Sequence, residues 1–74
     1  MNCVNALLRS RYACTPREAA LGSALVEGCT LAEAATALGI SIHTARTHLK
    51  RLFRKTGTSR QTEFLRLALL AHKS

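Results

Sequence analysis

TLAEAATALGISIHTARTHLKRLFRK, residues 30–55, is the stretch that decides the fold. Thr30 and Glu33 make a capping box, in which the hydroxyl and the carboxylate each accept a hydrogen bond from a backbone N–H at a helix start. Gly39 tolerates the left-handed conformation that often follows a helix end, and Ser41 is a preferred N-cap for the next helix. Two helices joined by so short a turn are typical of a helix-turn-helix.

Similar start and stop signals precede this stretch. Thr15 and Glu18 make another capping box, with Pro16 at the first helical position, where an N–H would have no partner inside the helix. The pattern predicts a helix from Pro16 to about Glu27 that Gly28 ends.

One more helix is predicted after the helix-turn-helix. Gly57 ends the preceding helix, and Thr58 or Ser59 caps a further one over about residues 60–71. Thr58 with Gln61 would make a third capping box at this start.

Length and composition fit one small helical domain. The chain has 74 residues, room for a single core. Twelve Ala and twelve Leu stand against two Val and two Ile, which favours helices over strands. Residues 1–14 show no clear period and no cap, so we expect an N-terminal linker or loosely ordered segment there. We therefore predict an all-α fold, a compact four-helix domain containing a helix-turn-helix, over residues 15–74.

The helix predicted over residues 42–55 has two chemically different faces. Its apolar residues gather on one arc of a helical wheel: Ile42, Ala45, Leu49, Leu52 and Phe53. The opposite arc is polar and basic: His43, Thr44, Thr47, Lys50, Arg51, Arg54 and Lys55, with Arg46 at its edge. No acid lies between Glu33 and Glu63, and the chain carries a formal charge of +7. A helix of about 14 residues is roughly 21 Å long and fits the major groove of B-DNA.

Five motifs follow one another along about residues 15–71: Thr15-Pro-Arg-Glu18, Glu27-Gly28, Ala35-x-x-Leu38-Gly39-Ile40-Ser41, Thr44-Ala-Arg-Thr-His48-Leu49 and Lys55-x-Gly57. Together they resemble the LuxR-type (GerE/NarL-like) helix-turn-helix DNA-binding domain. The resemblance implies a bacterial transcriptional regulator that binds double-stranded DNA in a sequence-specific way. In that family the third helix enters the major groove, and the fourth pairs with its mate in a DNA-bound dimer.

The resemblance also implies which side chains meet DNA. Base edges would be read by Arg46, Thr47 and Lys50, since Arg suits guanine and the Thr methyl suits thymine. Six other residues would contact phosphates or hold the helix in register: Ser41, Thr44, His48, Arg51, Arg54 and Arg60. His48 lies beside the apolar arc, so a packed structural histidine is the alternative at that position.

Some positions depart from the family pattern. Gly22, Ala24 and Ala45 stand where larger apolar residues are usual, and Thr56 and Thr58 replace an apolar pair. We therefore expect a thinner core. The domain usually sits at the C-terminus of a longer regulator, so the chain is either a fragment of one or a small free-standing regulator.

The fourth helix carries more apolar residues than one core-facing side needs: Phe64, Leu65, Leu67, Ala68, Leu69, Leu70 and Ala71. The surplus predicts a second buried face, most simply a homodimer contact on DNA. We expect the row with Phe64, Leu67, Ala68 and Ala71 to serve the core, and dimerisation to use Leu65, Leu69 and Leu70.

Other chemistries fit the sequence less well. The cysteines, Cys3, Cys14 and Cys29, are too far apart for a zinc ligand pair, and their odd number suits a reducing cytoplasm and small buried side chains. Four Glu, no Asp and so short a chain predict no enzyme, no catalytic residue, no metal and no cofactor.

A membrane surface and a second protein are two further kinds of partner for a basic helical domain. A membrane surface is disfavoured, because the third helix needs its apolar face for its own core. A protein-interaction or anti-activator module, dimerising with a longer regulator through the fourth helix, is the alternative to DNA binding. RNA polymerase is a further candidate partner of a regulator.

Overall fold

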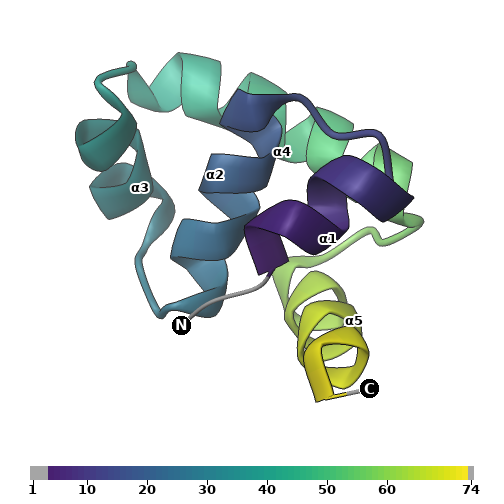
Figure 1. Cartoon of the computed structure of the whole chain (residues 1–74). Helices are drawn as coiled ribbons and strands as arrows, with labels where there is room; N and C mark the ends of the chain where they lie inside the picture. Colours follow the sequence, from purple (N-terminus) through teal and green to yellow (C-terminus); the bar gives the residue numbers. More distant parts are fainter. Residues whose placement is uncertain (1–3, 74) are drawn as a thin grey trace.

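The structure is a computed structural model that describes residues 4–73, the last three by their backbone alone. Within that range the chain forms five helices and no strand: α1 (Val4–Arg11), α2 (Pro16–Val26), α3 (Leu31–Leu38), α4 (Ile42–Thr56) and α5 (Gln61–Lys73). Figure 1 shows α2 at the centre, α1, α3 and α4 around it, and α5 projecting to one side. The all-α prediction is confirmed.

Helix α1 corrects the predicted count of four helices. Val4–Arg11 is helical where we expected a linker or loosely ordered segment, and Val4 and Leu8 are completely buried. An eight-residue helix is not stable alone in water, so burial of this i, i+4 pair against α2 is what stabilises α1. Residues 1–3 of the expected segment lie outside the described residues.

The predicted helix starts of α2, α3 and α4 are confirmed. Thr15 Oγ1 accepts from the Glu18 N–H at 3.2 Å, and Glu18 Oε1 accepts from the Thr15 N–H at 3.0 Å. Thr30 and Glu33 repeat this reciprocal pair at 3.1 and 2.8 Å. At α4, the hydroxyl of Ser41 accepts from the backbone N–H of residue 44.

The predicted glycine stops of α3 and α4 are also confirmed. Gly39 and Gly57 follow these helices with φ of 69° and 71°, the left-handed region. After α3, the Ile40 N–H bonds back to the Ala35 carbonyl at 3.0 Å, the closing hydrogen bond that the left-handed glycine makes possible. Helix α2 ends at Val26, one residue before the predicted end.

The start of α5 differs from the predicted Thr58–Gln61 capping box. The carboxylate of Glu63 accepts from the N–H groups of Ser59 and Arg60, at 2.9 and 3.2 Å, and from the Ser59 hydroxyl at 2.7 Å. These bonds, the one from the Ser59 hydroxyl above all, hold the pKa of the Glu63 carboxyl below its ordinary value. The Thr58 hydroxyl instead lies 3.0 Å from that of Thr56.

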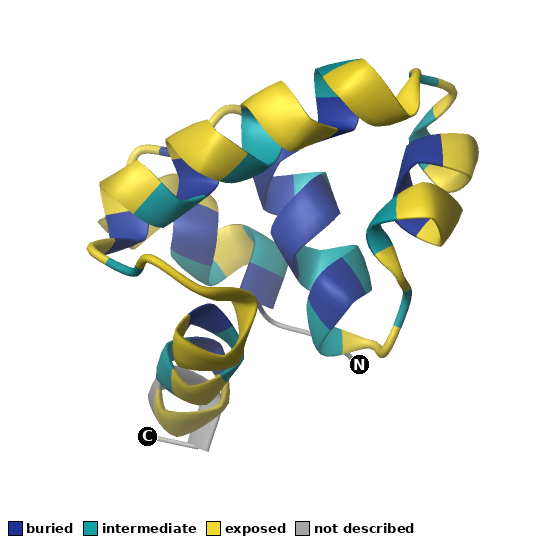
Figure 2. Ribbon diagram, turned by 180° about the vertical axis from the view of Figure 1, so that it is seen from behind, coloured by how far each residue is buried: buried dark blue, intermediate teal, exposed yellow. Residues whose placement is uncertain are grey.

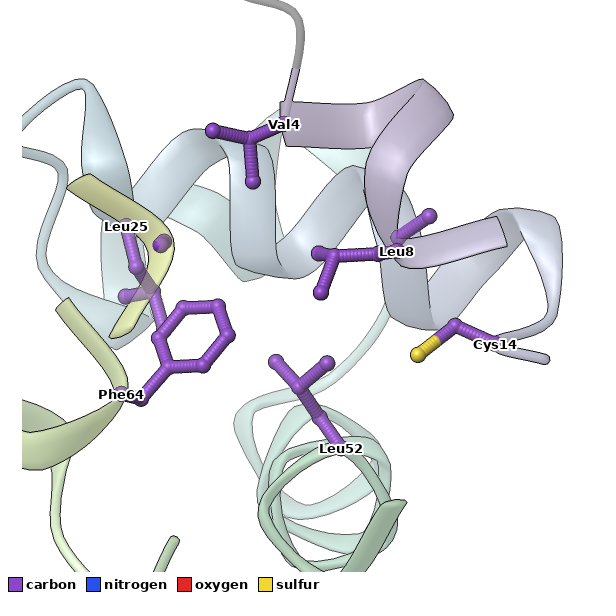
Figure 3. Packing of buried hydrophobic residues seen from close by; sticks show 8 residues of the cluster. Val4, Leu8, Cys14, Leu25, Leu52 and Phe64 are labelled. Carbon is purple, nitrogen blue, oxygen red and sulfur yellow. The ribbon is translucent and has the colours of Figure 1, made fainter. Parts of the chain in front are cut away.

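The core lies where α1, α2, α4 and α5 meet. Figure 3 shows Leu8 of α1, Leu52 of α4 and Phe64 of α5 converging there beside Leu25 of α2. Cys14 lies at the edge of this cluster, and burial first, with the Glu18 charge second, raises the pKa of its thiol. A neutral, buried thiol is the small hydrophobe that the sequence predicted for this residue.

Two of the departures from the family pattern have a local explanation. Gly22 is buried, and the side chains of Leu8, Leu52 and Phe64 occupy the space around its Cα. Thr56 is buried too, and its hydroxyl donates to the Leu52 carbonyl at 2.9 Å within α4, so its polar atom has a partner. Part of the volume that a side chain at residue 22 would occupy is filled by Leu8 of α1, a helix that the sequence analysis did not expect.

Candidate nucleic-acid interface

Helices α3 and α4 form the predicted helix-turn-helix around Gly39–Ser41 (Figure 1). The inward side of α4 is apolar as expected: Ala45 and Leu52 are fully buried, and Leu49 and Phe53 pack against the core from a half-buried position. Ile42 differs from the predicted arc, because 38% of it is exposed at the start of the helix.

The outward side of α4 is basic along its length. Figure 2 shows the run of exposed residues on this side, which includes His43, Arg46, Thr47, Lys50, Arg51 and Arg54. No carboxylate of the described residues lies within ion-pair distance of its four cations. We call these four, Arg46, Lys50, Arg51 and Arg54, the α4 cation row. Unpaired cations on one face attract a polyanion because no internal acid neutralises them.

The three residues proposed to read bases lie together. Arg46, Thr47 and Lys50 are exposed on the outward side of α4, Lys50 one helical turn after Arg46. Arg51 and Arg54 continue the same surface toward the end of the helix. The structure therefore groups these five side chains on one accessible face.

The other residues proposed for the DNA backbone have more varied positions. Ser41 is exposed at the start of α4, and its hydroxyl donates to the hydroxyl of the half-buried Thr44 at 3.0 Å. Arg60 is exposed but precedes α5, which begins on the side of the molecule away from the outward face of α4 (Figure 2). The structure does not bring Arg60 together with the α4 cation row.

His48 points away from that face. It is half-buried, and its Nδ1 is buried with no hydrogen-bond partner among the described residues. Its electrostatic contribution helps to lower the pKa of Glu18, a buried acid of α2. This position favours the alternative that the sequence left open, a packed histidine between α4 and α2.

The ion pair between α2 and α4 was missed by the sequence analysis. Lys55 Nζ lies 2.6 Å from Glu18 Oε1, and it also donates to the Ala13 carbonyl at 3.2 Å. The Glu18 side chain is 2% exposed and that of Lys55 33%. Lys55, assigned to the basic arc, is therefore engaged with α2. The sequence did contain a signal for this ion pair, because Glu18 is an acid in the first turn of α2, a helix that has to pack against the basic helix α4.

Electrostatics keeps the Glu18 carboxylate charged despite its burial. Desolvation raises its pKa. The hydrogen bonds from Lys55 and from the Thr15 N–H, together with the electrostatic effects of Lys55 and His48, lower the pKa by more than desolvation raises it. The net pKa of Glu18 lies below its ordinary value. The ion pair therefore fixes α4 on α2 at neutral pH.

A second contact fixes α3. Arg17 donates from Nη1 to the Leu38 carbonyl at 3.1 Å, at the C-terminal end of α3. A cation at that end also suits the helix dipole. Two neighbouring residues of α2, Arg17 and Glu18, thus hold both helices of the helix-turn-helix.

On α5, the row predicted to serve the core is largely buried, and two of the three residues predicted to meet a partner are exposed. Phe64 and Ala68 are fully buried and Leu67 is half-buried, as expected of the core row, whereas Ala71 lies outside the residues whose side chains are described. Leu69 and Leu70 are 48% and 63% exposed. Leu65, grouped with them as a partner contact, packs from a half-buried position against the core.

The fold and this basic face define a helix-turn-helix domain of the DNA-binding class. Residues 13–68 match the family model GerE, described as bacterial regulatory proteins of the luxR family, so the chain belongs to that family. The resemblance seen in the sequence is confirmed, and DNA is the partner that it implies. Neither the curated proteins nor the solved structures gave a significant match.

Among the residues that the structure describes, no helix is long and apolar enough to cross a membrane. No three His, Cys, Asp or Glu side chains among them gather in a way that could hold a metal ion.

Replacing Glu18 by Gln tests the ion pair. At pH 7 we expect Glu18→Gln to lower the free energy of unfolding by about 1–2 kcal/mol, since a charged hydrogen bond is lost and Lys55 can partly turn to water. The Gln oxygen can still accept from the Thr15 N–H. Because the pKa of Glu18 is lowered on folding, its stabilisation is present above the unfolded pKa, about 4.3, and is lost as pH falls through the folded value.

Urea denaturation at pH 7 and at steps below pH 4.5 measures this difference. Glu33→Gln is the matched control, because Glu33 has the same capping role but is exposed and has no ion-pair partner among the described residues. Its effect should stay within about 0.5 kcal/mol. Equal effects of the two variants, or a Glu18→Gln effect that does not shrink in acid, would contradict the account.

Proposed function

We propose that this chain regulates bacterial transcription by sequence-specific binding of double-stranded DNA, with α4 in the major groove. The observation that carries the proposal is the exposed α4 cation row on the second helix of a helix-turn-helix. An α-helix is about 10–12 Å in diameter with its side chains, which suits the major groove about 12 Å wide, and the 15 residues of α4 make it about 22 Å long. Membership of the luxR family supports the same function. A cytoplasmic location and the absence of catalysis follow from that role.

Within α4 we assign two kinds of contact. Arg46, Thr47 and Lys50 read base edges, because they share one exposed turn of the helix and carry groups that match guanine and thymine. Arg51 and Arg54 hold phosphates on the same face, with the hydroxyls of Ser41 and Thr44 at the helix start and Arg60 at a distance from them. His48 keeps a packing role.

We further propose that α5 pairs with α5 of a second copy on DNA. Leu69 and Leu70 are the large apolar side chains that α5 exposes among the described residues, and Leu65 borders them from the core side. One helix per subunit buries far less than the ~1,600 Å² of a standard interface, so the free chain is a monomer. Two adjacent half-sites then supply the effective concentration for pairing.

The same exposed leucines favour a second candidate function. A protein-interaction or anti-activator module would use Leu69 and Leu70 to pair with a longer regulator and would need no base contact from α4. RNA polymerase is a further partner to test if the chain activates transcription. Loss of DNA affinity on removing α4 cations separates DNA binding from both.

Alanine variants test the two kinds of contact in α4. Arg46→Ala or Lys50→Ala should cost about 1–3 kcal/mol on the preferred duplex and much less on random DNA, because a base contact is lost. Arg54→Ala should weaken both duplexes by similar amounts, since a phosphate contact carries no sequence information. Fluorescence anisotropy titration on both duplexes is the measurement.

The matched control removes a cation elsewhere. Arg66 is exposed on α5, away from the cation row, so Arg66→Ala should leave both affinities nearly unchanged. If Lys50→Ala, Arg54→Ala and Arg66→Ala behave alike on both duplexes, then α4 does not read the groove.

A charge in the exposed patch of α5 tests pairing. Leu69→Lys should leave the circular dichroism spectrum helical, because Leu69 is about half exposed. It should abolish cooperative binding to a duplex with two half-sites and spare binding to a single half-site. Gln61→Lys, which adds the same charge in the first turn of α5, is the control and should keep cooperativity. Retained cooperativity in Leu69→Lys would place the dimer contact elsewhere.

A further inference from the structure

The space beside Gly22 is filled in part from outside the part of the chain that matches the family. A Cβ at this position of α2 would lie 2.6 Å from Leu8 Cδ1, 2.9 Å from Phe64 Cζ and 3.2 Å from Leu52 Cδ2. Glycine weakens a helix interior, and no left-handed conformation calls for it here. Gly22 is therefore explained by space: it leaves a notch where α1, α4 and α5 meet. Leu8 fills that notch from α1, which precedes the matched residues 13–68.

The backbone of the same residue organises the segment that follows. The Leu8 carbonyl accepts from the N–H groups of Tyr12 and Cys14, at 3.2 and 3.1 Å, which folds residues 12–14 back onto the end of α1. Between them Ala13 has a φ of 55°. Its carbonyl accepts from Lys55 Nζ at 3.2 Å, the group that pairs with Glu18. A continuous set of contacts thus leads from Leu8 to the last turn of α4.

We propose that α1 and residues 12–14 are a positioning element for the DNA-binding face, locked by Leu8 in the Gly22 notch. Leu8 acts through Leu52 of α4 and Phe64 of α5, and the Ala13 carbonyl acts through Lys55. None of these groups belongs to the α4 cation row. The element fixes how α4 lies on α2 and relative to α5. This inference rests on the proposed DNA binding.

The notch itself is tested by thermal unfolding of the full chain. Gly22→Ala should lower Tm by roughly 5 °C or more, because the new methyl meets Leu8 Cδ1 at 2.6 Å. In a Leu8→Ala background the same substitution should lower Tm by less, since the contact with Leu8 Cδ1 is gone while Phe64 Cζ and Leu52 Cδ2 still lie 2.9 and 3.2 Å from the new methyl. Leu7→Ala is the matched control: Leu7 is half-buried on α1 outside the core cluster, so Gly22→Ala should still destabilise there. Equal effects of Gly22→Ala in all three backgrounds would overturn the lock.

The positioning role is tested by affinity for the preferred duplex, at a temperature where circular dichroism shows every variant fully folded. Leu8→Ala should raise Kd roughly 2- to 30-fold and leave the slope of log Kd against log salt unchanged, because the phosphate contacts remain. Leu8→Val should raise Kd to a smaller extent, and it replaces Leu8→Ala in the test if Leu8→Ala does not fold. Leu7→Ala should leave Kd as it is.

The outcomes separate this inference from the proposed function. A purely structural Leu8 would leave Kd unchanged in the folded variants, and that result would overturn the positioning role while DNA binding stands. A parent chain that binds no duplex would overturn the proposed function and the positioning role together. The dependence of the Gly22→Ala effect on the side chain at residue 8 would then still decide whether the lock exists.

Discussion

The buried carboxylate of Glu18 is the interaction on which the arrangement of the helix-turn-helix depends. It caps α2 through the Thr15 N–H and pairs with Lys55 of α4 at 2.6 Å. A buried acid is stable only when it is paired and hydrogen-bonded, so α2 and α4 have to meet with these two side chains in register. The neighbouring Arg17 holds the end of α3 in the same way. One turn of α2 thereby holds the end of α3 beside the turn and the last turn of α4.

The distribution of acids explains why the outward face of α4 stays basic. Three of the four Glu residues, Glu18, Glu33 and Glu63, accept hydrogen bonds at the starts of α2, α3 and α5. Helix α4 begins instead with the neutral cap Ser41. A carboxylate at that start would stabilise the helix dipole but repel a phosphate. The neutral cap leaves the first turn of α4 open to an anion.

Local chemistry allowed much of the fold to be predicted. Two capping boxes, the Ser41 cap and two left-handed glycines fixed the bounds of α3 and α4 and the start of α2, because each signal acts within a few residues. The α4 cation row followed from helical periodicity for the same reason.

What the sequence did not predict depends on contacts between distant residues. Helix α1 has one buried pair, Val4 and Leu8, and its stability comes from packing this pair against α2, with Leu8 beside Gly22, which no local pattern reveals. Lys55 was grouped with the DNA-facing cations because a helical wheel does not show which neighbour carries an acid. The packing of Leu65 against the core was not predicted for a similar reason, since the wheel does not show where the core ends.

The most direct test of the central claim, that the unpaired cations of α4 bind duplex DNA, is the salt dependence of binding. Fluorescence anisotropy of a labelled duplex, titrated with the full chain between 50 and 200 mM salt, measures it. If a dimer neutralises about 6–10 phosphates, affinity should fall by roughly 10³–10⁵ over this range, because the release of counterions from the DNA becomes less favourable as the salt concentration rises. An affinity that barely changes with salt would contradict the account.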